Sequence, residues 1–161
     1  MPDHSTLTTA EAAWRGVSAA FAALGRVFIC LDDRGRIIHA SMRLDDLLGP
    51  GSSRLAEGRP IEDLLGAGLF GASGVMRAAL DGGERREGWR ADLCLDDRGP
   101  RVVSVSAAPF PRELFDGCDA RVRSVVVVRP ADEDRDTAFG GPSSIGGLVA
   151  RSPAMLGILT L

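Results

Sequence analysis

Large apolar side chains recur at helical spacing near the start of the chain. They lie three or four residues apart, with alanine at many positions between them, and they are Trp14, Val17, Phe21 and Leu24. This spacing places them on one stripe of a helix. Thr8 and Glu11 are spaced as a capping box at its start, and Gly25 is suited to end it. We predict a helix whose apolar stripe docks either on a sheet of its own chain or on a second copy.

Farther along, the pattern changes to that of strands. Residues 89–95 alternate strictly between two faces, and residues 103–107 alternate between valine or alanine and serine. Short apolar runs bounded by turn residues add further strands. The predicted strands are 27–31, 36–40, 89–95, 102–109 and 121–129.

One hexapeptide, Cys-Leu-Asp-Asp-Arg-Gly, occurs twice, at 30–35 and 94–99. Each copy ends a predicted strand, and its Asp and Gly residues favour a tight turn. The flanking segments do not match, so we interpret the repeat as the same turn chemistry used twice and not as a duplicated domain. Both copies predict a β-hairpin.

Short helices are predicted between the second and third strands. Ser41 is placed to cap a helix that runs to Leu48, a second helix follows Pro60, and residues 75–80 form a third. Residues 66–74 are glycine-rich and predict a loop. The order of elements predicts an α+β fold, in which a sheet of five antiparallel strands carries the short helices on one face.

Composition and charge exclude several classes of protein. The chain has 161 residues, 45% of them hydrophobic, which suits one domain with a core and short appendages. The net charge of −3, with arginine and acidic residues interleaved, argues against a nucleic-acid surface. No apolar run approaches the ~18 residues that span a bilayer, and no secretory signal opens the chain. With three cysteines in no close pair, we expect a cytoplasmic protein with free thiols that binds neither nucleic acid nor a membrane.

The C-terminal part changes character again. Residues 131–144 turn acidic and then rich in Gly, Pro and Ser, which predicts a linker. Ser152-Pro153 is a helix-start signal, and the apolar residues after it have no partner element before Leu161. We therefore expect that the chain is part of a longer protein.

Residues 145–155 read Ile-Gly-Gly-Leu-Val-Ala-Arg-Ser-Pro-Ala-Met. This segment resembles the opening of the AAA+ ATPase domain in sigma-54-dependent (NtrC-like) transcriptional activators, although Ala150 stands where that family usually has Gly. The resemblance implies a parent protein with an ATPase that remodels sigma-54 RNA polymerase and a helix-turn-helix that binds enhancer DNA. The chain itself has no Walker A loop and no Lys, so we expect no enzyme activity from it.

The middle of the chain, about residues 26–129, resembles a PAS domain. The matching motifs are Gly35–Ser41, Leu47–Gly49, Gly58–Leu65, Glu87–Trp89, Asp97–Gly99 and Val102–Pro109. The resemblance implies a sensory domain whose sheet curls around its short helices. Two positions depart from the family: Ser41 stands where Asn is frequent, and Arg129–Asp132 replaces the usual Asp-Ile-Thr exit motif.

A sheet of this kind can enclose a ligand cavity, and eight apolar residues are candidates to line it. The expected walls are Trp89, Leu93, Val103 and Val105 on the strands, with Leu47, Leu64, Met76 and Leu80 opposite. The alternative is that these side chains simply fill a core. We predict no haem, because residues 74–82 contain no His ligand. We predict no photoreactive flavin either, because no Cys lies between residues 31 and 93 and the chain lacks Asn and Gln. An unidentified small ligand is the open alternative.

The remaining chemistry-bearing residues are scattered. Cys30, Cys94, Cys118 and His39 lack the short spacings of a zinc site, so we predict no metal. His39 is expected within a strand, paired or half-exposed. Cys94 is expected to face outward near Arg90, which makes it the better candidate for redox sensing.

These observations together predict four segments: a flanking helix at 1–25, a PAS domain at 26–130, a linker at 131–144 and the start of an ATPase domain at 145–161. We predict a sensory module that forms a homodimer through the stripe of Trp14, Val17, Phe21 and Leu24. It would control the ATPase by ligand binding or by rearrangement of the dimer. Two alternatives are a PAS module of a histidine kinase, whose chain would continue into a long helix bearing a His, and a small-molecule-binding domain without a role in transcription.

Overall fold

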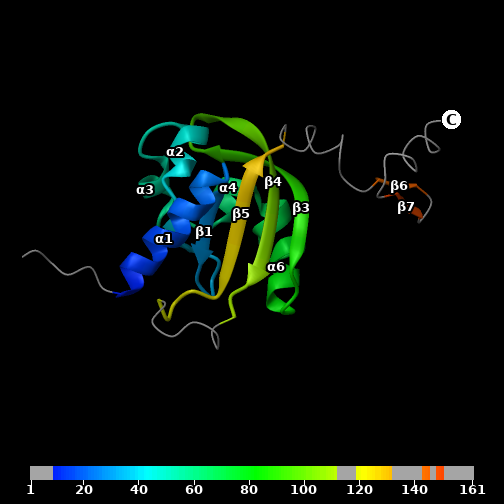
Figure 1. Cartoon of the computed structure of the whole chain (residues 1–161), viewed down its shortest axis with the longest axis horizontal. Coiled ribbons are helices and arrows are strands. Elements are labelled where there is room, and N and C mark those ends of the chain that lie inside the picture. The colour runs from blue at the N-terminus through cyan, green and yellow to red at the C-terminus, as the bar shows by residue number, and fades with distance from the viewer. Residues whose placement is uncertain (1–8, 112–118, 132–142, 146–147, 151–161) are drawn as a thin grey trace, which may run out of the picture.

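The computed structural model describes residues 9–111, 119–131, 143–145 and 148–150. Its main body is a five-stranded antiparallel sheet in the order β2-β1-β5-β4-β3 (Figure 1). The strands are β1 (Val27–Leu31), β2 (Ile37–Ala40), β3 (Arg86–Leu95), β4 (Arg98–Pro109) and β5 (Ser124–Pro130). The fold class predicted from the sequence is therefore confirmed. β1 has its predicted bounds, whereas β3 begins three residues and β4 four residues earlier than predicted, and β5 begins three residues later.

Short helices occupy the connection between β2 and β3. They are α2 (Arg43–Leu48), α3 (Ser52–Ala56), α4 (Glu62–Leu65), α5 (Ala67–Phe70) and α6 (Val75–Asp81). The single turns α3 and α5 were not predicted, and α5 lies within the segment expected to be a loop. The start of α3 is stabilised from outside the helix: the carboxylate of Asp45 accepts hydrogen bonds from the N–H groups of Gly51 (3.1 Å) and Ser53 (2.7 Å).

Alternate residues of β1 point to opposite faces of the sheet. Val27, Ile29 and Leu31 pack in the main core together with apolar side chains of the short helices. Phe28 and Cys30 belong to a second cluster on the other face, which we call the outer face, and Trp14 and Phe21 of α1 (Thr9–Ala23) pack there. The short helices thus cover the inner face, and α1 lies over β1 on the outer face (Figure 1).

A tight helix end joins α1 to β1. Gly25 has φ 69°, and its N–H bonds to the carbonyl of Ala22 at 2.9 Å, while the N–H of Arg26 bonds to the carbonyl of Phe21 at 2.9 Å. This pair of bonds is a Schellman motif, in which glycine is favoured because positive φ strains other residues. The predicted end of the helix at Gly25 is confirmed, and the chain turns there from α1 directly into β1.

The repeated hexapeptide forms two different turns. In the first copy, Asp32 Oδ1 accepts hydrogen bonds from the N–H groups of Arg34 (2.9 Å) and Arg36 (2.8 Å), which closes a loop over 32–36. In the second copy, β3 and β4 are joined by residues 96–97 alone, and Asp96 has φ 52°. Both hairpins were predicted, but their shared sequence does not determine the length of the loop.

Beyond the main sheet, β6 (Ser143–Ile145) and β7 (Leu148–Ala150) pair with each other. They fall at the end of the predicted linker and the start of the predicted ATPase segment. Residues 1–8, 132–142 and 151–161, which include the predicted Thr8 cap and the predicted C-terminal helix, lie outside the described residues. The division into four segments therefore stays a prediction. In the part of the chain that the structure describes, no helix has the length and apolar character needed to span a membrane.

Candidate functional site

The side of α1 that faces the sheet carries aromatic residues. The ring of Trp14 has its centroid 6.0 Å from that of Phe28, 6.1 Å from Phe110 and 6.3 Å from His39. Phe21 stacks on Phe28 at 4.9 Å. Aromatic pairs at such separations contribute about 0.5–1.5 kcal/mol each beyond the burial of their area. We call Trp14, Phe21, Phe28 and Phe110 the aromatic cluster, and it holds α1 on the sheet of its own chain.

The predicted pairing stripe is divided between two environments. Trp14 and Phe21 are half-buried in the aromatic cluster, whereas Val17 is 38% exposed and Leu24 is 67% exposed. The structure thus brings Trp14 and Phe21 to the sheet and leaves the other two on the surface of α1. Pairing of two copies through this stripe stays a prediction.

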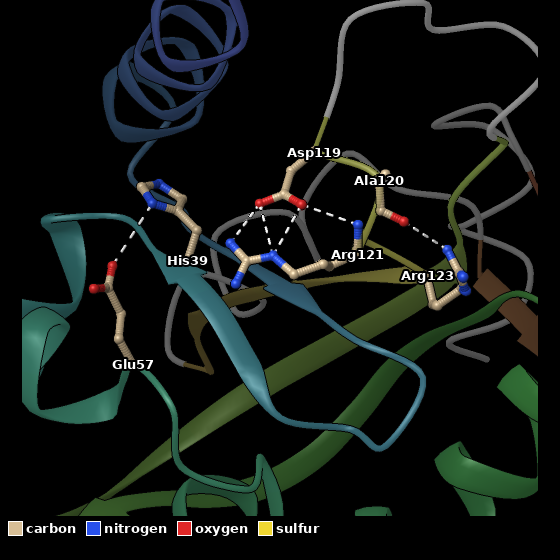
Figure 2. Close-up of polar contacts among 6 residues, drawn as sticks. All are labelled: His39, Glu57, Asp119, Ala120, Arg121 and Arg123. Carbon is tan, nitrogen blue, oxygen red and sulfur yellow. Dashed lines mark hydrogen bonds and ion pairs between the residues drawn. The ribbon is translucent and has the colours of Figure 1, made fainter. Parts of the chain in front are cut away.

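His39, on β2, contacts both α1 and the end of α3. Its Nδ1 lies 3.8 Å from a carboxylate oxygen of Glu57 (Figure 2), and its Nε2 lies 2.9 Å from the hydroxyl of Ser18. Burial lowers the pKa of His39 below its usual 6.5, and the carboxylate of Glu57 opposes this shift only in part. A neutral ring that carries its proton on Nδ1 would present this N–H to Glu57 and accept a hydrogen bond from the Ser18 hydroxyl. The expectation that His39 lies in a strand, paired or half-exposed, is confirmed.

The entry into β5 is stabilised by a local ion pair. The Asp119 carboxylate accepts hydrogen bonds from the backbone N–H of Arg121 (2.9 Å) and from its guanidinium (2.7 Å), which lowers the pKa of Asp119 (Figure 2). Arg123 donates to the carbonyl oxygen of Ala120 at 2.9 Å. Between these contacts Val122 is buried, and it packs in the same outer-face group as the aromatic cluster. The turn therefore fixes one wall of the surface on which α1 docks.

Ser41 has a role different from the predicted one. Its hydroxyl accepts a hydrogen bond from the backbone N–H of Phe28 at 3.0 Å, and its own N–H donates to the carbonyl of Phe28 at 2.9 Å. The N-cap position of α2 is Met42, without a side-chain cap bond. The prediction that Ser41 caps this helix is thus wrong: its side chain instead satisfies a buried donor of β1 and fixes the exit of β2.

The residues predicted to line a ligand cavity lie mostly in the main core. Those that are fully buried there are Leu64, Met76, Leu93, Val103 and Val105. Leu47 and Leu80 pack against this core, whereas Trp89, on edge strand β3, is 41% exposed. Two hollows lie beside α6. Leu80 lines one of them, and none of the other seven candidate residues lines either. The packing favours the alternative in which these side chains fill a core, and an internal ligand stays a prediction.

The thiols and possible metal ligands do not converge. Cys30 is buried on the outer face, Cys94 is half-exposed, and Cys118 lies outside the described residues. Within the described ranges, no group of three or more His, Cys, Asp or Glu side chains is placed to hold a metal ion. The expectations of no haem, no flavin and no metal remain predictions.

Sequence reasoning missed the polar contact between α1 and the sheet. Ser18 follows Trp14 by four residues and precedes Phe21 by three, so it lies within the apolar stripe. A hydroxyl in that position was a local signal for a polar partner on the docking surface. Its partner, His39, is 21 residues away in sequence, and no local pattern identifies it.

No family model matches the chain, and no curated protein matches it. Solved structures do match its fold. The PAS domain of an HTR-like protein from Haloarcula marismortui has a TM-score of 0.54 and 24% identity over 74% of this chain and 97% of that one. A PAS domain from a two-component sensor histidine kinase has a TM-score of 0.53 and 11% identity over 74% of this chain and 96% of that one.

A light-oxygen-voltage domain from a study of a flavin analogue has a TM-score of 0.54 and 19% identity, over 77% of this chain and 90% of that one. At these identities the likeness concerns the fold alone. The chain has the PAS fold, as the motifs between residues 26 and 129 indicated.

Proposed function

We propose that the chain is the sensory module of a sigma-54-dependent transcriptional activator, and that it controls a downstream ATPase in the cytoplasm. Two observations support this proposal: the PAS fold, and the resemblance of residues 145–155 to the opening of that ATPase domain. The module would carry out no catalysis and bind no DNA itself. Contacts with ATP, sigma-54 polymerase and enhancer DNA would belong to the rest of the parent protein.

The docking of α1 is the observation that carries the regulatory part of the proposal. The seam between α1 and the sheet includes the half-buried rings of Trp14 and Phe21 against the buried ring of Phe28, and the contact of Ser18 with His39. The main core on the inner face contains many fully buried side chains, among them Ile29, Leu44 and Leu64. Segments with few buried apolar contacts open at lower free energy than the core. We therefore infer that α1 can leave the sheet while the sheet stays folded.

The two sides of α1 give a route for a signal. With α1 docked, Val17 and Leu24 remain exposed and can contact a second copy. With α1 released, Trp14 and Phe21 join them and the complete stripe becomes available for pairing. A ligand or a change in pH that favours one state over the other would shift the population and change how two copies pair.

The test uses the full-length parent protein and a version that lacks residues 1–130. The coding sequence after residue 161 should contain a Walker A loop, and removal of the module should change the rate of ATP hydrolysis several-fold. A coding sequence that continues into a long helix with a phosphorylated His would support the histidine kinase alternative. An ATPase whose rate does not respond to removal of the module would contradict the proposed control.

Pairing is tested separately by sedimentation of the chain. Leu24→Asp introduces a charge at the most exposed position of the stripe, and we expect it to shift a dimer toward monomer. Arg15→Asp changes the charge on the same helix at an exposed position outside the stripe, and it is the matched control. A wild-type chain that remains monomeric at high concentration would contradict pairing through α1.

A further inference from the structure

Strand β3 forms a free edge of the main sheet. The strand order places it beyond β4 at one end of the sheet, and β4 is the only described strand that pairs with it (Figure 1). All residues from 86 to 90 are exposed. Among the described residues, no backbone–backbone hydrogen bond outside the β3–β4 ladder involves residues 86–95. An edge strand of this kind presents N–H and C=O groups with which another strand can pair.

The opposite edge of the sheet is covered by the chain itself. The N–H of Ile37 on β2 donates to the carbonyl of Arg59 at 2.9 Å, and the carbonyl of Ile37 accepts a hydrogen bond from the N–H of Gly58 at 2.7 Å. Arg36 and Pro60 form an isolated bridge beside these bonds. The segment 58–60 therefore occupies the edge at β2, and the edge at β3 is the one open to another strand.

A bulge in β3 decides which of its residues share a face. Between Arg86 and Trp89 the register shifts, because three steps along β3 match two steps along β4. The extra residue lies in Glu87-Gly88. Arg86 and Trp89 therefore both lie on the inner face, as their β4 partners Ala107 and Val105 do. The outer face of this stretch is charged, and its residues are Arg85, Glu87, Arg90 and Asp92.

A second copy of β3 fits this edge in one antiparallel register. If the two-fold axis passes through Trp89, the two Trp89 rings lie opposite each other. Counted through the bulge, Arg90 then lies opposite the partner's Glu87, and Asp92 lies opposite the partner's Arg85. Facing aromatic residues and facing opposite charges both stabilise a pair of strands. The two-fold axis repeats each of the two ion pairs.

The neighbouring registers bring like charges together. Moving one copy by two residues keeps the faces matched, but it places Arg90 opposite the partner's Arg90 and Asp92 opposite the partner's Glu87. Moving it the other way places the two Glu87 side chains opposite each other and Arg90 opposite the partner's Arg85. Like charges directly opposite are destabilising, and a slip by one residue exchanges the faces. Charges on an edge strand usually prevent pairing, whereas this sequence of charges permits it in a single register.

The charged side chains are available for these contacts. Within the described part of the chain, the side chains of Arg90 and Asp92 have no hydrogen bond or ion pair. Glu87 pairs with Arg85, whose Nε lies 3.2 Å from its Oε1, and both side chains are exposed. Exposed ion pairs contribute little to stability, so this one is readily exchanged for a pair with another copy.

We propose that β3 is a docking surface for β3 of a second copy, and that the pair joins two sheets into one continuous antiparallel sheet. This surface is distinct from the stripe on α1, because α1 contacts β1, and β5 and β4 lie between β1 and β3. The proposal goes beyond the proposed function, since it needs neither the ATPase nor the release of α1. Interfaces smaller than about 1,200 Å² are typically weak and transient, so we expect this pairing at millimolar concentrations.

The experiment follows the amide spectrum of the ¹⁵N-labelled chain by NMR as the protein is diluted from millimolar concentration. The chain carries Leu24→Asp, so that pairing through α1 and pairing through β3 can fail separately. We expect concentration-dependent shifts of the amides of residues 86–92. Arg90→Glu should weaken the pairing at least about tenfold, because it sets two carboxylates opposite each other twice. Arg54→Glu makes the same change of charge at an exposed position of α3 and should leave the pairing unchanged.

Mixing two variants tests the register itself. Arg90→Glu and Glu87→Arg should each pair poorly alone, whereas an equimolar mixture of the two should pair at least as well as the parent chain, because each carboxylate then faces a guanidinium. Amide shifts of residues 86–92 that do not depend on concentration would overturn the proposal. A mixture that pairs no better than either variant alone would also overturn it, as would an equal loss of pairing in Arg90→Glu and Arg54→Glu.

Discussion

Within the described residues Trp14 makes three ring contacts with the sheet and its loops, and its truncation gives the sharpest test of the docking of α1. The ring lies 6.0–6.3 Å from the rings of Phe28, Phe110 and His39. Three such contacts, at about 0.5–1 kcal/mol each for a partly exposed ring, give roughly 2 kcal/mol. Truncation of a fully buried Trp to Ala costs about 3–5 kcal/mol. Because Trp14 is half-buried, we expect Trp14→Ala to lower the free energy of unfolding by about 2–3 kcal/mol.

The assay is urea denaturation followed by far-UV circular dichroism, combined with hydrogen exchange of the α1 amides. Val17→Ala is the matched control, because Val17 is 38% exposed on the same helix and alanine is the better helix former. Its effect should stay within about 0.5 kcal/mol. The α1 amides should exchange faster in Trp14→Ala, whereas those of β1 and β5 should change less. Equal stabilities of the two variants would refute the assigned role of Trp14.

Three further predictions concern His39, two glycines and Ser41. Burial lowers the pKa of His39 in the folded state, so the contribution of its neutral ring to stability is complete above about pH 6.5 and is lost as the pH falls toward the folded-state pKa. Between about pH 7.5 and about pH 5.5, the free energy of unfolding should therefore fall more in the wild type than in His39→Phe. Equal losses in the two proteins would contradict this. Gly74→Ala should destabilise by more than about 2 kcal/mol in urea denaturation, since its Cβ would come 2.3 Å from the carbonyl oxygen of Leu69, whereas Gly68→Ala in the open turn α5 should stabilise by up to about 1 kcal/mol. Ser41→Ala should cost about 1–3 kcal/mol in the same assay, because it leaves the buried N–H of Phe28 without its acceptor, and a neutral effect would show that this hydrogen bond contributes nothing.

The alternation of residues in the strands predicted the two faces of the sheet correctly. In β4, Val103 and Val105 lie in the main core, while Ser104 between them lies on the outer face. Period-two patterns are read directly from sequence because a strand places neighbouring side chains on opposite faces. Trp89 keeps this pattern, since it lies opposite Val105, but it is 41% exposed because β3 is the edge strand of the sheet.

The glycines of residues 66–74 were misread for a physical reason. They predicted a loop, yet Gly71 and Gly74 have φ values of −64° and −70°, which any residue can adopt. What excludes a side chain there is space, since an added Cβ would come 2.6 Å from the carbonyl oxygen of Ala67 at Gly71. Close approach of backbones depends on tertiary packing and leaves no local signal, so α5 was not predicted.

The candidate sites depend even more on tertiary contacts. The helical stripe identified Trp14 and Phe21, but not whether they contact the chain's own sheet. The contact of Ser18 on α1 with His39 on β2 joins residues 21 apart in sequence, which only the docking of α1 brings together. A single sequence predicts such elements well and their pairing order poorly, because the order is decided by contacts distant along the chain.

Docking of α1 on the sheet of its own chain is measured most directly by isotope-filtered NMR. A mixed sample of ¹³C-labelled and unlabelled chains distinguishes contacts within one chain from contacts between two. We predict nuclear Overhauser effects between the indole of Trp14 and the rings of Phe28 and Phe110 within the labelled chain. Effects seen only between labelled and unlabelled chains, or none at all, would contradict a helix that rests on its own sheet.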